Sequence, residues 1–267
     1  MKRTACLAWL CLALSLPLWP ATVRAGVNDG IAAYSRGDYA TALREFRAAA
    51  NAGNASAQHN LGFLYMNGKG IAQNYKQAAE WFRKAAEQGK EESQHNLGFL
   101  YLNGLGVPRS YAEAAKWFRK AAEQGRAESQ YNLGLLYYEG RGLPRDYKKA
   151  LKWFLRAADQ DYAAAQGVLG TMYSKGLGVA RNPQKAIKWL RMAASRGNIQ
   201  AQKDLGRIYY EGQGVPRNFV KAYYWQAAAA AKGDETARKM LRDLSRAMSP
   251  QQIAEARKLA RRWNRPR

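Results

Sequence analysis

The sequence predicts an all-α fold built from stacked pairs of helices, and two observations carry this prediction. A motif recurs every 36 residues through most of the chain, without insertion or deletion. Such a period is typical of stacked supersecondary units. Within each copy, apolar residues return at the spacing of an amphipathic helix, and nothing alternates with the period of two that a strand requires. One helix pair cannot cover its own apolar face, so we expect residues 26–248 to form one solenoid.

Residues 1–25 have the three-part composition of a secretory signal peptide. Lys2 and Arg3 precede an apolar run over residues 5–18, and a Val-Arg-Ala sequence ends at Ala25. The apolar run is about 14 residues long, too short for the ~20 that span a bilayer, so cleavage is favoured over a retained anchor. We therefore expect cleavage after Ala25 and a mature protein that is periplasmic or secreted.

Each copy of the repeat is predicted to be two helices joined by a glycine turn. The first helix carries a Leu-Gly pair and the second a Trp, at Leu61, Leu97, Leu133, Leu169, Leu205 and at Trp81, Trp117, Trp153, Trp189, Trp225. Two glycines, such as Gly68 and Gly70, mark the turn between them. Small residues let the two helices approach closely while the Trp fills the volume around them. We therefore expect Trp153 to be buried, with a cost of ~3–5 kcal/mol for Trp153→Ala.

The fourth full copy departs from the others where its second helix ends. Asp161 stands in the place of the closing glycine. A residue other than glycine pays more to adopt the left-handed backbone conformation, although Asp is among the better tolerated. The sequence therefore predicts an irregular turn after Ala158.

The C-terminal end is predicted to close the stack. Residues 236–248 form a half unit with a more polar outer face, and Ser249-Pro250-Gln251-Gln252 has the capping residues of a helix start. Residues 249–267 are thus a basic capping helix, expected to bury Ile253, Leu259 and Trp263 against the helix around Met240 and Leu244. Its basic face beside an apolar stripe would also suit anionic membrane headgroups.

The repeated residues resemble the Sel1-like repeat over residues 56–233, in five copies. In the first copy they are Ala57, Gln58, His59, Asn60, Leu61, Gly62, Tyr65, Gly68, Lys69, Gly70, Lys76, Ala78, Trp81, Lys84, Ala85, Ala86 and Gly89. The segment with Gly30, Gly37, Asp38 and Tyr39 resembles the related tetratricopeptide repeat and would start the stack. The resemblance implies a right-handed superhelix with the first helix of each pair on its concave side, serving as a protein-interaction scaffold.

The chain is strongly basic, with a formal net charge of +23. Residues 26–180 hold 20 basic and 14 acidic residues, whereas residues 181–267 hold 20 basic and 6 acidic residues. This asymmetry predicts an anionic partner for the C-terminal half, through an attraction that salt would weaken. A basic composition is also a general property of many exported bacterial proteins.

The sequence holds no recognisable catalytic or metal-binding pattern. Both cysteines, Cys6 and Cys11, precede the expected cleavage site. The two histidines, His59 and His95, recur 36 residues apart without a third ligand in register. Motifs of nucleophilic or zinc-dependent enzymes are also missing. We expect no enzymatic activity, no cofactor, no metal and no nucleic-acid partner.

By analogy with the tetratricopeptide arrangement, three positions of each first helix should face the groove. They are His59, Phe63, Met66; His95, Phe99, Leu102; Tyr131, Leu135, Tyr138; Gly167, Thr171, Ser174; and Lys203, Arg207, Tyr210. This lining changes from aromatic and apolar to cationic along the chain. It would complement a protein or peptide with a hydrophobic stretch and an acidic segment or free carboxylate. Alternatively, Phe63 and Phe99 pack between repeats.

Two functions compete at this point. The first is a non-catalytic, monomeric interaction scaffold of the bacterial cell envelope that binds its partner on the concave face. The second is a cationic binder of anionic envelope polymers or lipids, such as peptidoglycan, lipopolysaccharide or head groups. Salt separates the two, because polymer binding should collapse at moderate ionic strength while an aromatic groove would retain affinity.

Overall fold

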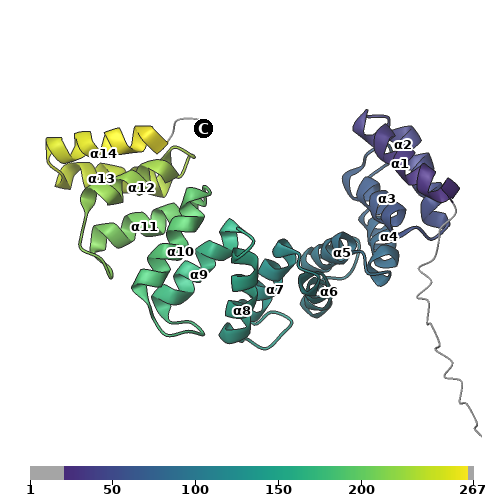
Figure 1. The fold of residues 1–267 in the computed structure, drawn as a ribbon, viewed down its shortest axis with the longest axis horizontal. Coiled ribbons are helices and arrows are strands. Elements are labelled where there is room, and N and C mark those ends of the chain that lie inside the picture. Colours follow the sequence, from purple (N-terminus) through teal and green to yellow (C-terminus); the bar gives the residue numbers. More distant parts are fainter. Residues whose placement is uncertain (1–20, 264–267) are drawn as a thin grey trace, which may run out of the picture. The chain divides into compact units, whose positions relative to one another are not determined.

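The computed structural model describes the backbone of residues 21–263 and the side chains of residues 26–260. Within that range the chain forms fourteen α-helices and no strand, which confirms the all-α repeat fold (Figure 1). The signal peptide predicted for residues 1–25 lies almost wholly outside the described residues. No helix in the described range is both long and apolar enough to cross a membrane.

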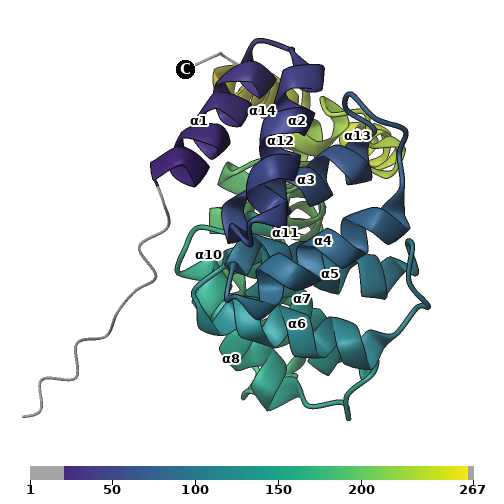
Figure 2. The same cartoon turned by 90° about the vertical axis from the view of Figure 1, so that its right-hand side faces the viewer.

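The helices fall into two compact units, of which unit 1 ends at Gln88 and unit 2 begins at Gly89. Unit 1 contains α1 (Ala21–Ser35), α2 (Tyr39–Asn51), α3 (Ala55–Asn67) and α4 (Tyr75–Glu87). Unit 2 contains α5 (Glu91–Asn103), α6 (Tyr111–Glu123), α7 (Ala127–Glu139), α8 (Tyr147–Ala158), α9 (Ala163–Lys175), α10 (Pro183–Ser195), α11 (Ile199–Glu211), α12 (Phe219–Ala230), α13 (Glu235–Ala247) and α14 (Pro250–Trp263). Within unit 1, α1 and α2 lie side by side in both views (Figures 1 and 2).

The turn inside each helix pair is bounded by residues that satisfy free backbone groups. The second helices begin at polar caps; the Asp146 side chain, for example, accepts a hydrogen bond from the Lys149 amide at 2.9 Å. The first helices end at glycines in the left-handed conformation, such as Gly68 with φ 66° and Gly140 with φ 73°. The paired glycines are therefore turn residues, as the sequence predicts.

The most deeply buried aromatic residue of the first three full repeats is a Phe, not the Trp that precedes it. Phe82, Phe118 and Phe154 are 0% exposed. A Cβ atom on Gly134 would lie 2.7 Å from the Phe154 ring, so the glycine of the Leu-Gly pair is needed to admit that ring. Trp153 is only partly buried, with the Arg156 guanidinium 4.8 Å from its ring centroid. The prediction of a buried Trp153 was therefore wrong, because its side chain packs at the edge of the core.

The turn after Ala158 is regular, which corrects the prediction of an irregular one. Asp161 adopts φ 62° and is the only residue other than glycine with a positive φ in the described range. Its amide donates to the Ala158 carbonyl at 3.0 Å, as the Gly125 amide donates to the Ala122 carbonyl at 3.1 Å. The Asp161 carboxylate also pairs with the Arg196 guanidinium. The regular turn is compatible with Asp, which is one of the residues other than glycine that tolerate the left-handed conformation best.

A ladder of glutamine side chains connects the ends of successive second helices. The Gln88 amide donates to the Gly53 carbonyl at 3.0 Å and to Gln58 Oε1 at 2.7 Å. The same two bonds recur at Gln124 and Gln160. Arg196 and Lys232 take this place in the last two full repeats, and within the described residues Oε1 of Gln166 and of Gln202 has no hydrogen-bond partner. The ladder is thus incomplete toward the C-terminus.

The terminal helix begins as predicted but packs differently. Ser249 and Gln252 form a reciprocal capping box, with bonds of 3.0 and 3.2 Å. Ala256 is fully buried and Ile253 is partly buried, in a cluster that contains Leu244 and Met240. The main partner of α14 is nevertheless α12 rather than α13, since the extended backbone of Met248 separates α13 from α14. The side chain of Trp263 lies outside the described residues.

Candidate functional site

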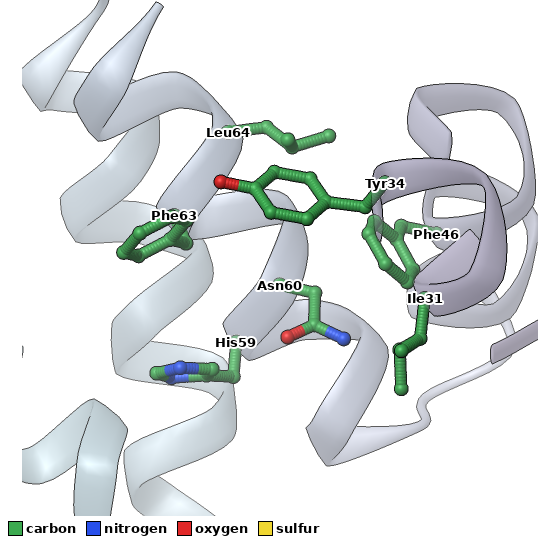
Figure 3. Close-up of a pocket in the computed structure, with 7 residues that line it drawn as sticks. All are labelled: Ile31, Tyr34, Phe46, His59, Asn60, Phe63 and Leu64. Carbon is green, nitrogen blue, oxygen red and sulfur yellow. The ribbon is translucent and has the colours of Figure 1, made fainter. Parts of the chain in front are cut away.

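Unit 1 contains an apolar pocket of about 380 Å³ on its first helices (Figure 3). Its walls come from α1, α2 and α3, and are formed by Ile31, Tyr34, Phe46, His59, Asn60, Phe63 and Leu64. The Tyr34 ring reaches from α1 toward Phe63, with the ring centroids 6.3 Å apart. Ile31 remains 47% exposed. This pocket is large enough for one apolar side chain of a partner, with Asn60 and His59 as polar groups within it.

Two of the three groove residues predicted for this repeat, His59 and Phe63, line the pocket. Met66 is half-buried further along α3. Sequence reasoning missed Ile31, Tyr34 and Phe46 as lining residues. Ile31 and Tyr34 lie on a first helix that departs from the 36-residue register, whereas Phe46 keeps that register, 36 residues before Phe82. Their signal was available in the helical spacing of Ile31 and Tyr34, three residues apart on one face.

The middle repeats present a more closed surface. Phe99 is 42% exposed, whereas Leu102, Leu135 and Tyr138 pack partly into the core of unit 2. Tyr131 stacks between its neighbours, with its ring centroid 5.8 Å from Phe154 and 5.2 Å from Tyr162. Of the predicted groove residues in α5 and α7, Phe99 thus offers the largest exposed apolar area.

His95 is held by a partly buried hydrogen bond. Its Nδ1 lies 2.8 Å from Ser129 Oγ of the next first helix, and its ring lies 5.6 Å from that of Phe118. Burial, reinforced by the charge of Arg126, lowers the pKa of His95 from 6.5 to about 4. The imidazole is therefore neutral near pH 7 and joins two adjacent helix pairs rather than carrying charge in a groove.

We expect His95 to make folding stability depend on pH. The native state keeps the ring neutral down to about pH 4, whereas the unfolded chain binds a proton below about pH 6.5. Stability from this group is therefore full above pH 6.5 and is lost as pH falls toward 4. The next repeat has Tyr131 at the position of His95, so His95→Tyr is the variant of choice. Between pH 7 and pH 4.5, its free energy of unfolding in urea should fall by about 2–3 kcal/mol less than that of the wild type. An equal loss in both proteins would contradict the assignment.

The predicted cationic end of the groove forms a second, polar pocket of about 260 Å³, wholly within unit 2. It is lined by Gln200, Lys203, Asp204, Arg207, Gln226, Thr236 and Met240, from α11, α12 and α13. We call it the terminal pocket. Lys203 Nζ lies 2.9 Å from Asp234 Oδ2, and Arg207 lies 3.3 Å from Asp204 Oδ1. The hydrogen bond from Lys203 and the helix-capping bond from the Ala237 amide hold the pKa of Asp234 below its usual value.

The other predicted residues of the last two full repeats have local roles. Thr171 Oγ1 donates to the Gly167 carbonyl at 3.4 Å, and Ser174 is half-buried. The Tyr210 ring lies 5.6 Å from that of Phe219. Sequence reasoning missed Gln226. It could have been found because the equivalent position of the other four full repeats holds Phe or Leu. No three metal-ligating side chains converge anywhere in the described range.

Comparison with known proteins identifies the repeat. The Sel1 repeat model matches residues 55–90, 91–125, 127–162, 163–198 and 199–234. A search of the curated proteins finds no match. Among solved structures, a Sel1 repeat protein from Oxalobacter formigenes has 33% identity and a TM-score of 0.77, covering 90% of this chain and 97% of its own.

A second similar structure is a protective antigen present in uropathogenic Escherichia coli strains, which displays the same repeat fold. It has 37% identity and a TM-score of 0.80, covering 90% of this chain. This chain spans about half of that protein, with 53% of its length covered. Since five repeat matches account for most of residues 55–234, the chain belongs to the Sel1 repeat family.

Proposed function

We propose that this protein is a non-catalytic interaction scaffold of the bacterial cell envelope, which binds a protein or peptide along the face lined by its first helices. Sel1 repeat proteins are generally protein-interaction scaffolds. The observation that carries the proposal is that the first helices of each unit line a pocket. Unit 1 has an apolar pocket to which α3 contributes, and unit 2 has a polar pocket to which α11 contributes. A partner with a hydrophobic stretch and an acidic segment or free carboxylate matches both linings.

The test compares two exposed residues on different helices. Phe99→Ala removes exposed apolar area from the first-helix face, while Lys188→Ala changes the exposed side of a second helix, α10. The mature protein and both variants are used as bait in cell-envelope extract. We expect Phe99→Ala to reduce capture of a partner retained by the wild type, and Lys188→Ala to leave capture unchanged. Capture that is reduced by Lys188→Ala and unchanged by Phe99→Ala would favour binding of an anionic polymer or lipid.

That second candidate is binding of an anionic polymer or lipid surface, and a separate feature favours it. α8 and α10 contain no acidic residue within their bounds. The cations Lys148, Lys152 and Arg156 form one exposed stripe along α8, at four-residue spacing. Binding through this stripe would fall between 50 and 200 mM salt by about 20- to 40-fold, as expected for three cations in contact with a polyanion.

Truncation after Met248 separates a structural from a membrane-binding role of α14. Since Ala256 is fully buried and Ile253 packs into the same core, we expect the truncated protein to lose about 2–3 kcal/mol of stability. Thermal melting and co-sedimentation with anionic vesicles measure the two roles. Unchanged melting with lost sedimentation would show that α14 is a membrane contact.

The envelope location belongs to the same proposal and rests on the signal-like composition of residues 1–25. Mass spectrometry of the protein purified from the periplasm should give a mature chain that begins at Gly26. Recovery of a chain that retains residues 1–25 in the cytoplasm would contradict this location.

A further inference from the structure

Gln226, a buried side chain of the terminal pocket, is polar at a position where the other full repeats have an apolar residue. The equivalent residues of the earlier repeats are Phe82, Phe118, Phe154 and Leu190, all at most 2% exposed, and the fifth repeat has Gln226 at 3%. Gln226 Nε2 donates to the Lys203 carbonyl at 3.2 Å, a contact that assigns which end of the amide is the nitrogen. Its Oε1 is buried and receives no hydrogen bond from any described residue.

A buried amide oxygen without a donor destabilises a fold by about 1–3 kcal/mol. An apolar residue would avoid that loss, as Leu190 does one repeat earlier. Oε1 of Gln166 and of Gln202 is also buried without a donor, but of the three glutamines only Gln226 lines the terminal pocket. A polar side chain at this point is therefore explained better by binding than by packing. The group that it would bind must carry a hydrogen-bond donor.

The terminal pocket also contains groups that attract an anion. Arg207 is 55% exposed and uses part of its guanidinium for Asp204, at 3.3 Å. A guanidinium has five donors in a planar fork, so it can bind a carboxylate as well. Thr236 adds a hydroxyl from α13, and Lys203 adds a second cation held at 2.9 Å by Asp234.

We propose that the terminal pocket binds the C-terminal residue of a partner polypeptide. The main-chain carboxylate lies against Arg207, and the N–H of the last peptide bond donates to Gln226 Oε1. That oxygen is buried in the free protein, so the amide turns toward the pocket on binding, as side chains commonly do at interfaces. A chain end carries this anion and this donor on one residue, whereas an internal Asp or Glu carries its carboxylate at the end of a flexible side chain. The volume of about 260 Å³ is smaller than that of pockets for drug-sized ligands and fits a single terminal residue.

This inference rests on the proposed function, and its test separates the two. A pool of random N-acetylated hexapeptides is synthesised twice, once with free C-terminal carboxylates and once with carboxamides. Each pool is passed over the immobilised mature protein, and retained peptides are quantified by mass spectrometry. We expect the wild type to retain the carboxylate pool about tenfold more than the carboxamide pool, the ratio that 1.4 kcal/mol gives.

Three variants assign the preference to residues. Gln226→Leu has the side chain that the preceding repeat already accommodates, and should melt at or above the wild-type temperature while losing most of the preference. Arg207→Gln removes an exposed cation and should reduce retention of the carboxylate pool alone. Lys188→Gln, on α10, is the control for lost charge and should behave as the wild type.

Each remaining outcome decides the question. Equal retention of both pools by the wild type would overturn the inference and leave peptide binding intact. Retention of neither pool would count against both the inference and peptide binding by the first-helix face. A Gln226→Leu variant that keeps the full preference would overturn the role of Gln226.

Discussion

Phe154→Ala is expected to lower the free energy of unfolding by about 3–5 kcal/mol, the usual cost of removing a fully buried aromatic side chain. Phe154 is 0% exposed and packs against Gly134, which has no Cβ to occupy the space that the ring would leave. The variant should therefore contain a cavity that its neighbours cannot fill. Urea denaturation followed by far-ultraviolet circular dichroism measures the change.

Trp153→Ala is the matched control, because Trp153 is the larger side chain and directly precedes Phe154. It lies at the edge of the core, with Arg156 over its ring. We expect it to lose less stability than Phe154→Ala despite removing more atoms. A larger loss at Trp153 would show that the tryptophan supports the repeat.

Gly178→Ala is expected to destabilise the fold by about 2–5 kcal/mol, through two effects that add. Gly178 has φ 68°, and an added Cβ would lie 2.5 Å from both the carbonyl carbon and the oxygen of Tyr147. A left-handed alanine costs about 1–2 kcal/mol. The contact with the backbone at the start of α8 adds a packing cost of about 1–3 kcal/mol, since backbone cannot move aside as a side chain does.

Gly176→Ala, two residues earlier in the same turn, isolates the conformational part. Its φ is 73°, and an added Cβ would meet its nearest neighbour only at 3.5 Å. We expect this variant to lose only about 1–2 kcal/mol. Equal losses at the two glycines, in thermal or urea unfolding, would show that the approach of this turn to α8 contributes nothing to stability.

Much of the fold was predictable from the sequence because the same local sequence features recur in all five copies of the repeat. The Leu-Gly pairs, the paired turn glycines and the capping box at Ser249 each have one local physical cause, and each was correctly assigned. Burial of the Phe rather than the Trp was not predictable by the same reasoning. Both residues recur with the same period, and only the three-dimensional direction of each side chain distinguishes them.

The candidate site was less predictable, because it depends on contacts between helices. The apolar pocket requires Tyr34, which lies outside the 36-residue register. The role of His95 depends on Ser129, 34 residues later, whose hydroxyl meets the ring only when two helix pairs stack. Asp161 likewise pairs with Arg196, 35 residues later. Such pairings are not visible in a window of sequence the length of one helix.

The incomplete glutamine ladder affects how unit 2 should unfold. In a solenoid, the coupling between neighbouring units decides whether the stack melts as one body or frays from an end. Neutral amide bonds at Gln124 and Gln160 tie the earlier closing turns, whereas charged side chains at Arg196 and Lys232 take over nearer the C-terminus. Arg196 makes neither of the two glutamine bonds and pairs with a carboxylate instead, which adds sensitivity to salt, whereas Lys232 keeps only the bond to a glycine carbonyl. Cooperativity should therefore decrease along unit 2, with amide hydrogen exchange fastest in α11 to α14 and slowest in α7 and α8.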